Sequence, residues 1–265
     1  MSDIVRVTIE FEAQESKRFR MYSGAFVRGF VYWVLRRMDK TFAEKLHSSK
    51  ELSPFSVTPV MSKKENLPVD RLEEGKEYGF SITFFIPEIG EAIKNYLMSA
   101  DRIYFTAVDN PLKRVYVRYC DEESLVDGAF DKFRVDFITP CYFRTPSESY
   151  RFVPLPLPNL MFRSLARLYS AFLSEIPQEY REWLDRNGIV VSGLKIETER
   201  VLLKKGKWAA GFKGFVNFSL PEDTYDEVCA EITSKLLNFG EYSNVGGSRT
   251  SGLGVIRVRK YENKE

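Results

Sequence analysis

Residues 244–259 read NVGGSRTSGLGVIRVR and concentrate glycine around a single arginine, directly before an alternating apolar run. Glycine permits positive φ angles and close approach by a ligand, so such a loop can direct backbone N–H groups at an anion while Arg249 adds positive charge. Phosphate is the expected ligand. Nucleotide-binding glycine loops follow a strand and precede a helix, whereas this loop follows a helical pattern and precedes a strand. The order therefore argues against a Rossmann or P-loop domain.

Outward from this loop, the second half of the chain has the predicted order β, α, β, β, α, β. The segments are a strand over 132–139, a helix over 160–173 with a short helix after it, strands over 189–204 and 208–220, a helix ended by Gly240, and a last strand over 254–260. The two long strands are joined by Lys204-Lys205-Gly206-Lys207, which predicts a hairpin with a cationic tip. Thr224 with Glu227 predicts a capping box for the second helix.

The first half repeats this order in pattern although not in residues. Strands are predicted over 4–12, 55–61, 77–86, 102–108 and 113–120, with helices over 24–38, 42–47 and 88–99. Thr41 with Glu44 predicts a second capping box, and Asn110-Pro111 predicts the turn between the last two strands. An acidic, turn-rich segment over 121–131 separates the halves. We therefore predict an α+β protein of two tandem ferredoxin-like (βαββαβ) domains, residues 1–125 and 126–265.

Composition limits the functions that the chain can perform. Lys and Arg number 39 against 37 Asp and Glu, so the net charge gives no evidence for a polyanionic partner. Cys120, Cys141 and Cys229 lack metal-ligand spacing, which favours a reducing compartment and inert core thiols. With a single histidine the chain offers few imidazole ligands for a metal centre, so neither a metal nor a cofactor is expected. No apolar run approaches a membrane span and no signal-peptide pattern opens the chain, so we expect a soluble cytoplasmic protein.

Three segments together resemble the CRISPR-associated RNA-processing endoribonucleases of the superfamily called repeat-associated mysterious proteins. They are residues 26–54 with Leu46-His47 at a helix end, the run 137–140 (FITP) followed by Pro154-Leu155-Pro156, and the glycine-rich loop. The resemblance covers nearly the whole chain. It implies a protein that cuts precursor CRISPR RNA within its repeats, without a metal, by attack of a ribose 2′-hydroxyl that leaves 2′,3′-cyclic phosphate and 5′-hydroxyl ends.

This chemistry needs a base for the 2′-hydroxyl, an acid for the leaving 5′-oxygen and cations for the phosphate. The resemblance implies His47 as acid or base, because imidazole titrates near neutral pH, with Tyr32 and Lys50 beside it. Further residues are expected to bind RNA, in the loop, on the first helix and at the hairpin tip: Gly246, Gly247, Ser248, Arg249, Thr250, Gly252, Gly254, Arg28, Lys204, Lys205 and Lys207.

Other interpretations of the same residues stay open at this point. Tyr32 also suits a core position, the lysine tip suits a soluble turn, and the glycines suit a turn with special backbone demands. A non-catalytic subunit that holds guide RNA in a CRISPR effector complex would carry the same fold and loop. An unrelated enzyme with a phosphate-bearing ligand is a third function. Expected partners are precursor CRISPR RNA and, as alternatives, other effector subunits or a second copy of the chain.

Overall fold

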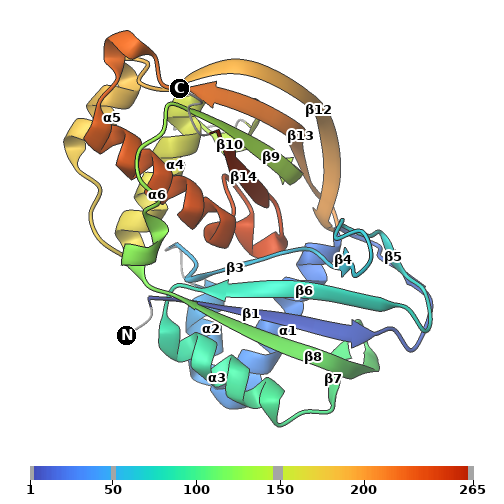
Figure 1. Ribbon diagram of the computed structural model, residues 1–265. Helices are drawn as coiled ribbons and strands as arrows, with labels where there is room; N and C mark the ends of the chain where they lie inside the picture. Colours follow the sequence, from blue (N-terminus) through green and yellow to red (C-terminus); the bar gives the residue numbers. More distant parts are fainter. Residues whose placement is uncertain (1–2, 49–51, 146–151, 262–265) are drawn as a thin grey trace. The chain divides into compact units, whose positions relative to one another are not determined.

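A computed structural model describes residues 3–48, 52–145 and 152–261 of the chain (Figure 1). The chain divides into two compact units. The first unit contains Met1–Cys120, Leu202–Trp208 and Arg249–Gly252, and the second contains Asp121–Val201, Ala209–Ser248 and Leu253–Glu265. Two short segments of the second half of the sequence therefore belong with the first unit. One is the tip of the predicted lysine hairpin, and the other is the middle of the glycine-rich loop.

The first unit is an antiparallel sheet with helices packed against it, in the strand order β3-β6-β1-β8-β7. Its elements are β1 (Ile4–Glu12), β2 (Lys17–Arg18), α1 (Ser23–Met38), α2 (Lys40–Ser48), β3 (Phe55–Val57), β4 (Met61–Ser62), β5 (Arg71–Leu72), β6 (Glu77–Phe84), α3 (Pro87–Met98), β7 (Arg102–Phe105) and β8 (Val108–Cys120). The succession β1, α1, β3, β6, α3, β8 is the predicted ferredoxin-like order.

Strand β1 shows why this half folds as its pattern predicts. Val5, Val7 and Ile9 alternate along the strand and are fully buried in the core cluster, as one face of a half-buried strand requires. Thr8 lies between them on the opposite face, where its hydroxyl is 2.8 Å from that of Ser81 on β6. The period of two therefore separates an apolar face under the helices from a polar face.

The second unit repeats the fold with the strand order β12-β13-β9-β14. Its elements are η1 (Glu122–Leu125), β9 (Lys132–Cys141), β10 (Phe143–Arg144), β11 (Phe152–Val153), α4 (Pro158–Phe172), α5 (Gln178–Asp185), β12 (Val190–Lys204), β13 (Lys207–Ser219), η2 (Glu222–Thr224), α6 (Glu227–Ser243) and β14 (Ile256–Lys260). Between α6 and β14 the chain forms the short helix η3 (Arg249–Ser251). The predicted α+β class with two tandem ferredoxin-like folds is confirmed.

Both predicted capping boxes are wrong, because an aspartate near each threonine makes the cap. The Asp39 carboxylate accepts a 2.9 Å hydrogen bond from the backbone N–H of Phe42, so Asp39 rather than Thr41 caps α2. The Asp226 carboxylate accepts a 2.8 Å bond from the N–H of Cys229, so Asp226 rather than Thr224 caps α6. Asp and Thr are both good caps, and the choice between them depends on where the first turn begins.

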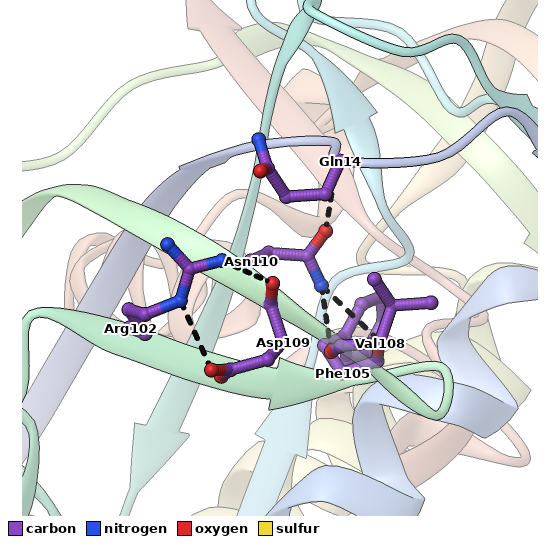
Figure 2. Close-up of polar contacts among 6 residues, drawn as sticks. All are labelled: Gln14, Arg102, Phe105, Val108, Asp109 and Asn110. Carbon is purple, nitrogen blue, oxygen red and sulfur yellow. Dashed lines mark hydrogen bonds and ion pairs between the residues drawn. The ribbon is translucent and has the colours of Figure 1, made fainter.

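The turn between β7 and β8 also differs from the prediction. It lies at Thr106 and Ala107, whose φ angles are 57° and 64°, and not at Asn110-Pro111. Asn110 is inside β8 and 1% exposed. Its amide group donates to the carbonyl oxygens of Val108 (2.9 Å) and Phe105 (3.2 Å) and accepts from the backbone N–H of Gln14 (3.2 Å), as Figure 2 shows. The asparagine thus satisfies the backbone around a tight turn without being part of it.

Replacing Asn110 with Ala is expected to lower the free energy of unfolding by about 2 kcal/mol, because two carbonyl groups and one N–H lose their partner in a buried site. The neighbouring Asp109 is a matched control. Its carboxylate lies 3.0 Å from Arg102 in an exposed ion pair, so Asp109→Ala is expected to cost less than about 1 kcal/mol. Urea unfolding followed by circular dichroism measures both. Equal losses would show that the Asn110 contacts add nothing.

The three cysteines are buried and free of disulfides, as predicted. Burial raises the pKa of the Cys141 thiol, and burial, with Asp226 nearby, raises the pKa of Cys229 to about 12. Both thiols are therefore protonated and poorly nucleophilic at neutral pH.

Candidate nucleic-acid interface

The start of the glycine-rich loop is seated on Tyr142, which follows β9. Gly246 has a φ of 78°, and a Cβ there would stand 2.4 Å from the Tyr142 carbonyl oxygen. A Cβ on Gly247 would stand 2.4 Å from the Tyr142 ring. The N–H of Gly247 donates to that carbonyl at 2.9 Å, and the hydroxyls of Ser248 and Tyr142 are 2.7 Å apart. Gly246 and Gly247 are therefore required by packing on Tyr142.

The end of the loop closes on its beginning. Gly254 has a φ of 70°, and a Cβ there would lie 1.8 Å from the Val245 carbonyl oxygen. The N–H of Val245 donates to the Gly254 carbonyl at 2.7 Å, and the N–H of Gly254 donates to the Pro140 carbonyl at 3.0 Å. Residues 245 and 254, near the two ends of the loop, are thus joined by a backbone hydrogen bond beside the end of β9.

The middle of the loop, η3, packs with the first unit against the start of α1. A Cβ on Gly24 would stand 2.1 Å from the Ser251 carbonyl oxygen, and a Cβ on Gly252, whose φ is 77°, would stand 2.7 Å from the Pro59 nitrogen. Arg249 and Thr250 are half-buried in this helix. Every glycine of the loop thus has a steric reason for being glycine, so the prediction that the loop binds phosphate needs support from elsewhere.

A group around Tyr142 offers chemistry suited to nucleic acid. The Arg144 guanidinium Nη2 lies 3.4 Å from the Tyr142 hydroxyl, which in turn contacts the Ser248 hydroxyl. The ring of Phe152, 38% exposed, meets the Tyr142 ring edge-on at 4.7 Å between centroids. An arginine, two hydroxyls and an exposed aromatic ring are groups that contact phosphates and unstacked bases. Sequence reasoning missed Tyr142 and Gly24, because each is explained only by a segment about a hundred residues or more away.

The predicted catalytic residues are described only in part. Tyr32 on α1 is 7% exposed and packs edge-on against Phe55 at 5.8 Å between centroids, so its ring is part of the core cluster. The Arg28 guanidinium carbon lies 5.6 Å from the centre of that ring. His47 is in α2, but its side chain lies outside the described residues, as does Lys50. The structure brings Arg28 and Tyr32 together, and the roles of His47, Tyr32 and Lys50 stay predictions.

The hairpin tip carries the predicted cluster of cations. Lys204, Lys205 and Lys207 are exposed at the end of β12 and β13, around Gly206 with a φ of 75°. Lys213 does not extend this cationic surface, because its amine lies 2.8 Å from Glu199 and 3.3 Å from Glu197. The hydrogen bond to Glu199 is the main cause that raises the pKa of Lys213.

The part of the chain that the structure describes has neither a metal-binding cluster nor a helix that could span a membrane. Among residues 3–48, 52–145 and 152–261, no cluster of three or more His, Cys, Asp and Glu residues is arranged to hold a metal ion. Over the same part of the chain, no helix combines the length and apolarity needed to span a membrane.

Comparison with known proteins gives the family resemblance. Residues 135–256 match the family model described as CRISPR-associated endoribonuclease Cas6. The curated "CRISPR-associated endoribonuclease Cas6" of Mycobacterium tuberculosis (strain CDC 1551 / Oshkosh) is 31% identical over 141 residues, which are 51% of this chain and 41% of that relative. The match thus spans less than half the length of this relative.

Solved structures of Cas6 proteins have the same fold. A Cas6 product complex superposes with a TM-score of 0.78 at 20% identity, covering 97% of this chain and 100% of the other. A Thermus thermophilus Cas6 gives a TM-score of 0.72 at 21% identity, covering 98% and 99%. The predicted resemblance is therefore confirmed: residues 135–256 match the family model of the CRISPR-associated endoribonuclease Cas6, and the chain has the fold of the solved Cas6 structures.

Proposed function

We propose that this chain is a metal-independent endoribonuclease that cleaves CRISPR repeat RNA. The observation that carries the proposal is the family match over residues 135–256, which includes Tyr142 and the whole glycine-rich loop. The curated relative that is 31% identical over 141 residues is named an endoribonuclease. The cationic hairpin tip and the group around Tyr142 supply contacts that an RNA backbone and its unpaired bases would use.

In the proposed reaction the ribose 2′-oxygen forms a bond to the adjacent phosphorus while the bond from phosphorus to the 5′-oxygen breaks. A base accepts the 2′-hydroxyl proton and an acid protonates the leaving 5′-oxygen, so the products are a 2′,3′-cyclic phosphate and a 5′-hydroxyl. His47 serves one of these proton transfers. Arg249, with the loop backbone, holds phosphates of the bound RNA.

The test is incubation of purified protein with repeat RNA in excess EDTA. We expect one defined cut, a 5′ product whose 3′ end carries a cyclic phosphate, and a 3′ product that accepts phosphate from a polynucleotide kinase without prior dephosphorylation. The matched control is the same RNA with one 2′-deoxynucleotide immediately 5′ to the cut. It lacks the nucleophile, so it should bind equally well and stay intact.

Each outcome bears on a different part of the proposal. Cleavage of the deoxy-substituted RNA at the same bond would contradict attack by the 2′-hydroxyl. Cleavage that EDTA abolishes and added Mg²⁺ restores would contradict metal independence. Tight binding of repeat RNA with no cut at any pH would replace the nuclease with a non-catalytic RNA-binding subunit, an alternative that the burial of the Tyr32 ring favours.

A further inference from the structure

The sheet of the second unit has one face that its helices do not occupy. On β9, Phe133, Val135 and Phe137 are buried, and the Phe133 ring packs edge-on against Phe162 of α4. Because side chains alternate along a strand, Arg134 and Asp136 lie on the opposite face. This second face therefore carries charged groups where the first carries the core.

Strand register places an aromatic ring and two more arginines beside these groups. Asp136 pairs with Phe215 on β13 and with Arg257 on β14, so the three form one row across the sheet. Arg134 pairs with Arg259 on β14 in the next row. We call the set Arg134, Asp136, Phe215, Arg257 and Arg259 the arginine face.

Contacts within the arginine face hold one guanidinium over the ring. The Arg134 guanidinium carbon lies 3.8 Å from the centre of the Phe215 ring. Asp136 fixes this arrangement, because its carboxylate lies 2.7 Å from Arg134 and 3.0 Å from Arg259. Asp136 is 14% exposed while Arg259 is 66% exposed. A nearly buried carboxylate thus orients arginines whose other edges reach solvent.

The arginine face carries excess positive charge. It contains three arginines and one carboxylate, a net charge of about +2, and the ion pairs that the structure gives to this carboxylate are with Arg134 and Arg259. Guanidinium groups bind phosphate in a bidentate manner and stack on bases, and an aromatic ring on a sheet strand is a stacking surface for an unpaired base. One strand of the arginine face, β14, starts at Ile256, which is two residues after Gly254 of the glycine-rich loop.

We propose that the arginine face binds a single-stranded segment of RNA, with a base stacked on Phe215 and Arg134 and phosphates held by Arg257 and Arg259. This inference rests on the proposed function, since it assigns part of the same RNA. It adds a site that reads unpaired nucleotides, built from residues other than those predicted for proton transfer.

The test measures affinity for a single-stranded RNA oligonucleotide without self-complementarity and, separately, single-turnover cleavage of repeat RNA at saturating protein. Phe215→Leu keeps the apolar bulk and removes the ring, so binding of the oligonucleotide should weaken about 10-fold. Phe215→Tyr keeps the ring and should bind as the parent does. Arg257→Gln should reduce the slope of log affinity against log salt by about 0.7, the value for one phosphate contact on a single strand.

The matched control is Arg186→Gln, which removes an exposed arginine that follows α5 and should leave both affinity and salt slope unchanged. If the parent binds RNA while Phe215→Leu stays within twofold and Arg257→Gln keeps the full slope, the inference is overturned and the proposed function stands. If the parent neither binds nor cuts repeat RNA, the proposed function itself fails. Should Phe215→Leu misfold by its thermal unfolding profile, the salt slope of Arg257→Gln decides alone.

Discussion

His47→Ala is expected to slow single-turnover cleavage of repeat RNA by roughly 100- to 10,000-fold, the usual contribution of a positioned acid or base. Affinity for the RNA should stay within about twofold, because the imidazole acts on protons in the transition state and adds little to binding of the ground state. The measurement pairs a cleavage time course at saturating protein with a binding titration of uncleavable, deoxy-substituted RNA.

Two other variants make this result specific to His47. Lys40→Ala removes an exposed cation from the first turn of the same helix, α2, and should change neither rate nor affinity. Arg249→Ala should show the reverse pattern, with affinity about 10-fold weaker and a smaller salt slope, because a phosphate contact is lost. A His47→Ala protein that cuts at the parent rate would remove the histidine from the mechanism and leave the binding claims intact.

Local patterns predicted most of the fold because each half of the chain follows its own periodicity. The alternation of apolar residues along β1 and their helical spacing in α1 indicate which face of each element is buried, and no distant residue is needed for that prediction. The same reasoning failed at the β7–β8 turn, where Asn110-Pro111 has the composition of a turn but lies within β8. Thr106 and Ala107 adopt positive φ angles at this turn, and neither residue type is typical of that conformation.

The loop shows the same limit at the candidate site. Its glycines stand out in sequence, and phosphate binding is the natural interpretation of them, yet each is also demanded by a particular neighbour. For Gly246, Gly247 and Gly252 the neighbours are Tyr142 and Pro59, which are far away in the chain and carry no local sign of the contact, whereas the neighbour of Gly254 is Val245 within the loop. The arginine face was missed for a related reason, because only strand register brings Phe215, Asp136 and Arg257 into one row.

Gly254→Ala is expected to be the most destabilising single change in the loop. A Cβ in the left-handed conformation of this residue costs roughly 1–2 kcal/mol, and relieving its overlap with a carbonyl oxygen costs roughly another 1–3 kcal/mol. The opposing oxygen belongs to Val245, whose N–H donates to Gly254, so neither strand can move away without breaking that hydrogen bond. Urea unfolding should therefore show a loss of about 3 kcal/mol or more.

Gly128→Ala in the same unit separates the two causes. Its φ is 87°, and a Cβ there meets no atom of the described chain within 4 Å, so only the backbone penalty of roughly 1–2 kcal/mol applies. The difference between the two variants then measures the overlap at Gly254. If Gly254→Ala keeps its stability yet loses RNA affinity, the glycine serves close approach of the RNA. If both are lost together, its first role is to let residues 245 and 254 meet, and phosphate binding depends on that closure.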